Sequence, residues 1–331
     1  MNEDRSPADL PAYRDLPIAP GNPPGSAWGV FGDDDEVGTI NLLTPERVRE
    51  ALATPRRGAV FSLNWDVEKP DPPILGRKAL EHHIIDLKPG ADDYYDRFYP
   101  QASTQWDALC HMPHPRYGYY NGRTQADITG RPGSRNGIEQ WAERGIVGRF
   151  VLADVARYRE AIGRPLRADR SDGVTPDDLD ATLQRQGVTL RTGDILLIRM
   201  GWLGWYERQD ARTRQALAAA GQDLRTPGLV GTEAMAAWLW DAHVAAVACD
   251  VPALEVLPSG PWNADDPEST WDAYLHFRII PLLGLAVGEM FVLDALAEDA
   301  AGDGEYRGLF TAAPLHKVGG AGSPANALAI K

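Results

Sequence analysis

The sequence predicts an α/β fold. Short apolar runs typical of strands buried on both faces, such as 195–199 and 243–250, alternate with segments that begin like helices. Two of those segments start with a threonine followed by a proline, at 44–45 and 175–176. The threonine is the expected N-cap, and the proline takes the first helical position. Because such strands and helices follow one another along the chain, a sheet covered by helices is the expected architecture.

The individual elements follow from the same patterns of polarity and turn residues. Residues 92–99 are expected to form a loop or pocket rim, and 319–331 a strand or loop. Strands are predicted over 60–65, 82–87, 148–155, 195–199 and 243–250. Helices are predicted over 44–53, 138–142, 175–186, 232–241 and 272–283, the last of them broken by Pro281.

Two segments make up the expected domain organisation. Residues 1–25 carry six prolines and few large apolar groups, so we expect an irregular Pro-rich arm. This arm is acidic and has no apolar stretch of the signal-peptide kind. Residues 26–331 are expected to form a single domain, because no repeat or linker divides them.

The amino-acid composition limits the kinds of molecule that this protein is expected to bind. The chain has 331 residues and a formal charge of 33 − 47 = −14, which argues against nucleic acid or an anionic membrane as the main partner. Its two cysteines, Cys110 and Cys249, form no metal spacing and no disulfide framework. No apolar run is long enough to span a bilayer. A soluble, cytoplasmic protein that acts on a small molecule is the simplest expectation.

The stretch 101–122 is where we expect the chemistry to lie. Gln105 and Asp107 are two residues apart, so an extended segment points both side chains to one face. His111 follows four residues later and can curl back if the strand breaks there, and His114 lies close by. An acid, an amide and an imidazole that converge could hold a divalent metal or move protons. The alternative is a strand end whose polar groups cap a helix and face solvent.

Two later polar residues lie in apolar surroundings. His276 sits within Y-L-H-F, and Glu289 lies inside the apolar run G-L-A-V-G-E-M-F-V-L. A carboxylate inside such a run needs a partner or it shifts its pKa. The alternative for His276 is an ordinary packed core residue. Asp250 ends a buried strand, a position that often lines sites in α/β folds.

Other kinds of active site lack their sequence signatures. There is no glycine-rich phosphate loop and no G-x-S-x-G turn that would expose a nucleophilic serine. Cys110 and His111 are adjacent, which makes a catalytic pair between them sterically awkward. His82 and His83 point to opposite faces of a strand, so at most one of them could join a site.

The chain resembles the cyclase-like metal-dependent hydrolases, a family that includes kynurenine formamidases, isatin hydrolases and trans-dienelactone hydrolases. The resemblance covers residues 28–330, and the closing G-S-P-A-N-A-L-A-I is similar to the longer branch of the family. It implies a swivelling β/β/α sandwich-like barrel, found as a homodimer or homotetramer. Four stretches carry it: W-G-V-F-G-D-D-D-E-V-G-T-I-N-L-L, T-Q-W-D-A-L-C-H, G-D-I-L-L-I-R-M-G-W, and His276 with Glu289.

The resemblance also implies a set of ligands. The family pattern H-x-G-T-H-x-D-x-x-x-H places its aspartate on Asp107 and its last histidine on His111, and the late ligand pair falls on His276 and Glu289. Its two earlier histidines fall on Gln101 and Gln105, and a neutral glutamine is a poor ligand for zinc. We therefore expect one divalent metal, Zn²⁺ or Mn²⁺, with Gln105 as a weak ligand or a hydrogen-bonding group for substrate.

Roles for further residues are hypotheses from the chemistry of their side chains. His111 and His276 are expected to move protons where they do not bind metal, and Glu289 belongs to the same catalytic set. The expected substrate-binding residues are Gln101, Trp106, His114, Tyr119 and Tyr120.

The expected activity is hydrolysis of a lactone, a cyclic amide or an N-acyl bond such as a formamide. Two alternatives remain open. The same site could run a cyclisation or dehydration, which removes a water where hydrolysis adds one. Loss of two family histidines could instead mark a non-catalytic small-molecule binder with a degenerate metal site, which need hold no stoichiometric ion.

Overall fold

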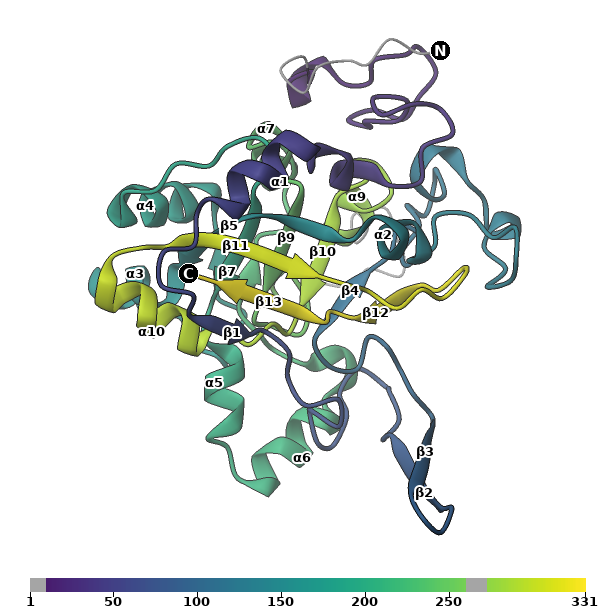
Figure 1. Cartoon of the computed structure of the whole chain (residues 1–331). Helices are drawn as coiled ribbons and strands as arrows, with labels where there is room; N and C mark the ends of the chain where they lie inside the picture. The colour runs from purple at the N-terminus through teal and green to yellow at the C-terminus, as the bar shows by residue number, and fades with distance from the viewer. Residues whose placement is uncertain (1–9, 260–272) are drawn as a thin grey trace.

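The computed structural model describes residues 10–259 and 273–331 and has one curled, mixed β-sheet at its centre (Figure 1). In spatial order the described strands of this sheet are β1 (Val60–Ser62), β13 (Ala327–Ile330), β11 (Arg307–Ala312), β5 (Ile146–Asp154), β7 (Ile195–Arg199), β9 (Ala246–Cys249), β10 (Ala286–Glu289), β4 (Gln105–Asp107) and β12 (Gly322–Pro324). The neighbours β5, β7, β9 and β10 are parallel, and the other pairs are antiparallel. Their apolar sequences suit this central position, because parallel strands are covered on both faces.

The last two strands show how strongly the sheet curls. β12 forms one edge of the sheet, whereas β13 lies beside β1 at the opposite edge. Only Ala325 and Asn326 separate them, and an extended chain advances by at most about 3.6 Å per residue. The two edges must therefore come close together, which makes the sheet a half-barrel. The predicted α/β fold with a sandwich-like barrel is confirmed.

Aromatic side chains fill the interior of this half-barrel. The ring centroid of Trp106 on β4 lies 5.2 Å from that of Phe291, 6.1 Å from that of Phe310 on β11 and 6.4 Å from that of Trp141. Because β4 and β11 are not neighbours in the sheet, the contact between Trp106 and Phe310 crosses the interior. Residues alternate along a strand, so the residues before and after Trp106 point to the outer face.

Helices cover the sheet, and several begin where the sequence predicts. The Thr44 side chain accepts a hydrogen bond from the backbone N–H of Arg47 (3.4 Å), and Thr175 and Asp178 form a reciprocal capping box. The described helices are α1 (Pro45–Leu52), α2 (Glu139–Arg144), α3 (Val155–Ala161), α4 (Pro176–Gln186), α5 (Trp202–Glu207), α6 (Ala211–Ala219), α7 (Glu233–Asp241), α9 (His276–Ile279) and α10 (Asp294–Asp303). Shorter elements are the 3₁₀ turns η2 (Tyr13–Asp15), η3 (Gly38–Leu42), η4 (Tyr120–Gly122), η5 (Gln125–Asp127) and η6 (Gly221–Asp223), and the paired strands β6 (Gly173–Val174) and β8 (Gly228–Leu229).

Two sequence predictions were wrong in extent or type. The helix predicted over 272–283 is only one turn, α9, although its first residue, Asp272, lies outside the described part of the chain. Pro281 and the left-handed Gly284 (φ +63°) follow it and direct the chain into β10. The segment 92–99 is largely a strand, β3 (Ala91–Asp96), rather than a loop, because it pairs with β2 (Glu81–Asp86).

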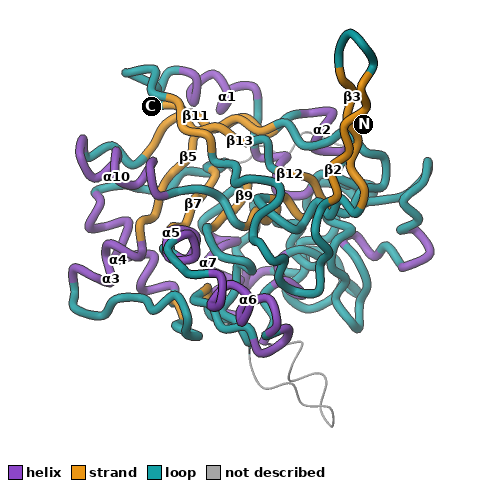
Figure 2. The backbone as a smooth tube through the Cα atoms, turned by 90° about the horizontal axis from the view of Figure 1, so that it is seen from below, coloured by secondary structure: helices purple, strands orange, loops and turns teal. Residues whose placement is uncertain are grey.

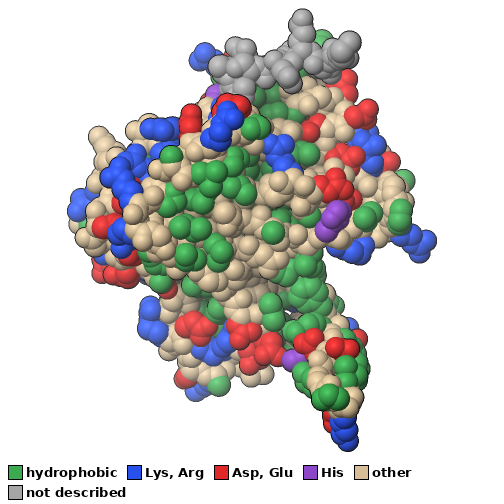
Figure 3. Space-filling model, in the orientation of Figure 1, with side chains coloured by type: hydrophobic (Ala, Val, Ile, Leu, Met, Phe, Trp, Pro, Cys, Tyr) green, Lys and Arg blue, Asp and Glu red, His purple; other side chains and the backbone are tan. Residues whose placement is uncertain are grey.

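These two strands form a hairpin that projects away from the body (Figures 1 and 2). Its side chains are exposed on both faces, and apolar and charged groups are mixed along it (Figure 3). The pairing places His82 opposite Tyr95 and His83 opposite Tyr94. The two histidines therefore lie on opposite faces of the hairpin, as their adjacency predicts.

The described part of the N-terminal segment, 10–25, lies against α7. The backbone N–H of Tyr13 donates to the Asp241 carboxylate (2.7 Å), and the indole of Trp240 donates to the carbonyl of Pro11 (2.8 Å). Among the helices in the two described ranges, none combines the length and the apolar composition that crossing a bilayer requires.

Candidate metal centre

Strands β4 and β10 bring three polar side chains to the outer face of the barrel. In their antiparallel register Gln105 lies opposite Glu289, and Asp107 lies opposite Val287. Cross-strand partners share a face, so Gln105, Asp107 and Glu289 point the same way, while Trp106 points into the core. The sequence spacing of Gln105 and Asp107 thus sets their common face, and the register adds Glu289.

His276 at the start of α9 completes a compact group. Its Nε2 lies 3.1 Å from Oε1 of Glu289 and 3.8 Å from Oδ2 of Asp107. One donor atom from each of Asp107, His276 and Glu289 lies within 4.8 Å of the other two, and all three residues are buried. Ligands held about 2.1 Å from a tetrahedral zinc ion are separated by about 3.4 Å from one another. The observed separations therefore suit three ligands of one divalent ion.

The carboxylate of Asp107 gives an independent test of whether a cation fits. Both of its oxygens are buried, and neither has a hydrogen-bond partner. An unpaired buried carboxylate is costly, so buried charges in proteins are paired or coordinate metals. The imidazoles near it stand at 3.7–3.8 Å, too far for a hydrogen bond. A cation between Asp107, His276 and Glu289 would satisfy both oxygens.

Glu255 orients the imidazole of His276 through the ring nitrogen Nδ1. Its Oε2 forms a short hydrogen bond with Nδ1 of His276, which directs Nε2 toward Asp107 and Glu289. Histidine ligands of metals usually donate their second ring N–H to a carboxylate in this way, which fixes the tautomer. The sequence analysis missed Glu255, although a charged residue inside P-A-L-E-V-L was a signal of the same kind as Glu289. The backbone of Gly228 packs against that of Glu255, and a Cβ there would lie 2.1 Å from the Glu255 carbonyl carbon.

Two donors hold the Glu289 carboxylate in place. The backbone N–H of Leu254 donates to Oε1 (2.9 Å), and Nε2 of Gln105 donates to Oε2 (2.5 Å). Since Gln105 Nε2 is engaged, its free acceptor is Oε1, which is buried and has no partner. Gln105 therefore orients Glu289 and leaves one oxygen for a weak interaction with an ion or a substrate.

The charges in this group determine its pKa shifts. Burial raises the pKa of the Asp107 carboxyl, but the positive charges of His111, His276 and Arg77 outweigh burial and hold that pKa below its usual value. Burial, followed by the charge of Asp107, raises the pKa of Glu289. Burial lowers the pKa of His276, but Glu255, Asp107 and Glu289 together raise it well above the usual value. Without a metal, these three carboxylates thus favour the protonated form of the His276 imidazole.

His111 lies at the solvent side of the group. It follows β4 in a turn in which its N–H donates to the carbonyl of Ala108 (2.8 Å). Its Nε2 is 3.7 Å from Oδ1 of Asp107, and its side chain is 23% exposed. His111 is therefore the imidazole that contacts both Asp107 and water.

The structure places the residues expected to bind substrate in several different surroundings. Trp106 lies in the barrel interior, so it does not line the centre. The phenol of Tyr119 donates to Gln125 (2.8 Å), and that of Tyr120 donates to Asp35 (3.1 Å), so neither hydroxyl is free. His114 belongs to a tight turn in which its Nδ1 accepts from the N–H of Arg116 (3.1 Å). The amide of Gln101 packs against Gly322, the cross-strand partner of Asp107.

Asp250, which follows β9, accepts hydrogen bonds from backbone N–H groups and does not belong to this centre. Its carboxylate accepts from the N–H groups of Met200 (2.6 Å) and Gly201 (2.7 Å) and so fixes the turn that opens α5. Burial raises its pKa to about 7, against the opposing charge of Arg199.

This shift predicts a pH-dependent contribution to stability. The folded state binds the Asp250 proton more tightly than the unfolded state, whose pKa is about 3.9. The carboxyl therefore stabilises the fold fully below about pH 4 and loses that contribution as the pH rises through about 7. Replacing Asp250 with asparagine removes the titration. We expect the variant to gain up to about 4 kcal/mol relative to the parent between pH 4 and pH 8. Urea unfolding of both proteins at these pH values measures the difference, and a constant difference would contradict the assignment.

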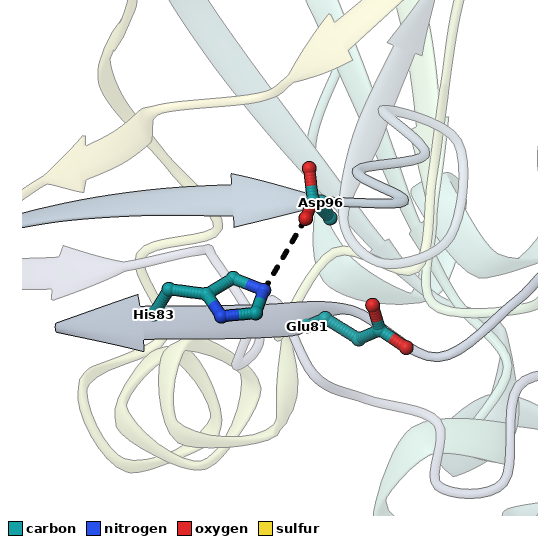
Figure 4. Close-up of side chains that lie close together, drawn as sticks. All are labelled: Glu81, His83 and Asp96. Atoms are coloured by element: carbon teal, nitrogen blue, oxygen red, sulfur yellow. Dashed lines mark ion pairs between the residues drawn. The ribbon is translucent and has the colours of Figure 1, made fainter.

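A second group of possible ligands lies at the base of the β2–β3 hairpin (Figure 4). Glu81, His83 and Asp96 come together there, and Nε2 of His83 lies 3.3 Å from Oδ2 of Asp96. Arg97 already pairs with Glu81 (2.6 Å), and all three side chains are at least 39% exposed. Arg97 neutralises Glu81 and His83 pairs with Asp96, so this group is an ion-pair cluster of the hairpin.

Comparison with known proteins agrees with the fold. Residues 41–256 match the Cyclase family model, described as "Putative cyclase". A solved structure described as a novel cyclase is 30% identical, with a TM-score of 0.79 over 92% of this chain and 99% of that chain. Isatin hydrolase A from Ralstonia solanacearum is 20% identical, with a TM-score of 0.58 over 82% of this chain and 92% of that chain. Isatin hydrolase A from Labrenzia aggregata, bound to benzyl benzoate, is 16% identical, with a TM-score of 0.56 over 82% and 93%. No curated protein matches the sequence.

The two isatin hydrolases share the fold with this chain. The family model covers more than half of the 331 residues, and the structure at 30% identity is matched almost from end to end. The resemblance inferred from the sequence is thereby confirmed, and the chain belongs to the Cyclase family.

Proposed function

We propose that this protein is a metal-dependent hydrolase that opens a lactone, a cyclic amide or an N-acyl bond. One divalent ion, Zn²⁺ or Mn²⁺, would be held by Asp107, His276 and Glu289, with His111 or Gln105 as a further ligand. The observation that carries the proposal is the buried Asp107 carboxylate, whose two unpaired oxygens face an imidazole and a second carboxylate. Asp, Glu and His are the usual ligands of catalytic zinc sites.

When bound by Asp107, His276 and Glu289, the ion would supply Lewis acidity, which would polarise a carbonyl and lower the pKa of water toward ~7. The protein's own residues divide the remaining tasks. Glu255 holds His276 in one tautomer, and Gln105 and Leu254 hold Glu289 in one orientation. His111 contacts both Asp107 and solvent, so it can carry a proton between the site and bulk water.

The names of the structural neighbours support a cyclic amide among the candidate substrates. Three of the matched solved structures are isatin hydrolases, which share the barrel with this chain. Isatin, a lactone and an N-formyl aromatic amine are therefore the first three substrates to test.

The test is turnover by metal-loaded and chelated protein, followed by mass spectrometry of the product. We expect Mn²⁺- or Zn²⁺-loaded protein to add one water to at least one of the three substrates, and exhaustive chelation to abolish the reaction. Readdition of the ion should restore it, which controls for unfolding. Activity that survives complete removal of metal would contradict the proposal.

A cyclisation or dehydration is the second candidate. It is favoured by the family itself and by the relative at 30% identity, which is described as a novel cyclase. Its product would be lighter than the substrate by one water, so the same mass measurement separates the two reactions. A non-catalytic binder is the third candidate, and protein purified without stoichiometric metal would favour it.

We further propose a cytoplasmic homodimer or homotetramer whose partner is a small molecule. The acidic balance of the chain supports the small-molecule partner, since it disfavours nucleic acid and anionic membranes. Sedimentation of the purified protein tests the oligomeric state.

A further inference from the structure

The segment 27–39 carries the motif W-G-V-F-G-D-D-D-E-V-G-T, and no residue of it belongs to the candidate metal centre. It consists of turns that lead into η3, and both of its ends are anchored in the core. Ala27 is fully buried, Thr39 is 2% exposed, and the Thr39 hydroxyl donates to the carbonyl of Ala245 (2.8 Å). We call residues 27–39 the clamp segment.

One set of contacts holds the chain that follows His276. Three donors of the clamp segment reach three carbonyl groups there: the N–H of Ala27 reaches Leu282 (2.8 Å), the indole N–H of Trp28 reaches Pro281 (2.7 Å) and the N–H of Thr39 reaches Gly284 (2.8 Å). The N–H of Leu282 in turn donates to the carbonyl of Arg278 within α9 (3.1 Å). Because α9 is a single turn, it is too short to be stable alone. These bonds therefore hold in place the short helix that carries His276.

A second set of contacts reaches the residue before His111. Oε2 of Glu36 accepts a hydrogen bond from the N–H of Asn136 (2.5 Å). The carbonyl of Asn136, which is fully buried, accepts from the N–H of Cys110 (3.0 Å). Glu36 is therefore linked, through one residue, to the backbone next to His111.

Gly38 lies between these two parts of the chain. A Cβ at Gly38 would lie 2.1 Å from the carbonyl oxygen of Gly284 and 3.1 Å from Cδ1 of Leu109. Gly38 also has a positive φ (+64°), which favours glycine. The clamp segment thus passes in close contact with both the chain before His111 and the chain after His276.

We propose that the clamp segment sets the separation of His111 and His276, with Trp28 and Glu36 as its positioning residues. The inference rests on the proposed function, because it takes both histidines to belong to the metal centre. Residues that orient the groups around a metal typically change its affinity by about 10- to 100-fold. Trp28 and Glu36 act through hydrogen bonds to the backbone, not through contact with the ion.

Hydrogen exchange of the metal-free protein tests the two links separately. Trp28→Phe keeps an aromatic ring but removes the indole donor, so the amides of 276–285 should exchange about 5- to 10-fold faster. Glu36→Ala removes the acceptor for Asn136, so the amides of 108–112 should exchange faster by a similar factor.

Each variant has a matched control. Trp238→Phe removes an indole that donates to Asp180 instead of to the backbone near His276. Asp34→Ala removes an acid that pairs with Arg135, as Glu36 also does, but leaves the bond to Asn136 intact. Both controls should exchange like the parent in the two ranges.

Metal affinity tests whether the clamp segment acts on the centre. Calorimetry with Mn²⁺, in buffer where urea unfolding shows every variant to be folded, should show about 10-fold weaker binding by Trp28→Phe and Glu36→Ala. The two controls should bind like the parent. A role in stability alone would lower the urea midpoint of the variants and leave their affinity for Mn²⁺ unchanged, which would overturn the inference.

The two experiments separate this inference from the proposed function. A parent that binds no Mn²⁺ would refute the proposed function, and hydrogen exchange would then decide the inference alone. Parent-like exchange near both histidines in Trp28→Phe and Glu36→Ala would overturn it. An effect in only one of the two variants would also contradict it, because a clamp needs both links.

Discussion

Replacing Asp107 with asparagine should leave the protein folded but without its metal. The substitution keeps the shape of the side chain and removes the charge that the geometry assigns to the cation. We expect the affinity for Mn²⁺ or Zn²⁺ to fall by at least about 100-fold, and hydrolysis to be lost with it. Thermal unfolding gives a second readout. Metal at 100 times the parent's Kd should stabilise the parent by about 2.7 kcal/mol, but the variant by no more than about 0.4 kcal/mol.

Asp250→Asn is the matched control for this experiment. Asp250 is also a buried strand-end aspartate, but its carboxylate caps backbone N–H groups at the start of α5. It should bind metal like the parent, whatever its effect on stability. If Asp107→Asn also kept a full complement of metal, the assignment of Asp107 as a ligand would be wrong.

Replacing Glu255 with glutamine should weaken metal binding by about 10- to 100-fold without removing any ligand. The neutral amide cannot stabilise the Nδ1–H of His276 as a carboxylate does, so the imidazole loses both basicity and orientation. Calorimetry with Mn²⁺ at pH 8 measures the loss. Asp180→Asn, which changes an acid that contacts Trp238 on α7, is a suitable control.

The same variant should change the pH dependence of metal binding. In the parent, His276 must release a proton from Nε2 to bind a cation, and its neighbours raise the pKa of that group. Metal affinity should therefore rise about tenfold per pH unit until the pH passes that pKa. Without the Glu255 charge the pKa of His276 falls, so the affinity of Glu255→Gln should level off at a lower pH. Identical pH profiles for the two proteins would show that Glu255 does not act through His276.

Local patterns in the sequence were enough to predict much of the fold. The Thr-Pro starts of α1 and α4 are short-range signals, and the structure confirms both helices with their caps. The buried strands β5, β7 and β9 were recognisable from apolar runs of the right length. β3 was missed because its D-D-Y-Y-D sequence has no apolar face, and only pairing with β2 makes it a strand.

The candidate site was predictable only in part, for a physical reason. A period of two places Gln105 and Asp107 on one face of β4, but it does not say which face is the core. The sequence therefore assigned Trp106 to the pocket, although its ring fills the barrel interior. Glu255 was missed because its role arises from a contact with His276, a residue from another segment of the chain. Its apolar flanks, P-A-L-E-V-L, indicate a buried charge, but they do not identify His276 as its partner.

A crystal structure of the Mn²⁺-soaked protein, with anomalous scattering recorded for manganese, tests the central claim most directly. The geometry predicts one strong peak per chain, about 2.0–2.3 Å from a side-chain oxygen of Asp107, Nε2 of His276 and a side-chain oxygen of Glu289. The hairpin cluster of Glu81, His83 and Asp96 in the same crystal is an internal comparison and should show no comparable peak. Manganese at the hairpin with none beside Asp107 would contradict the proposed centre.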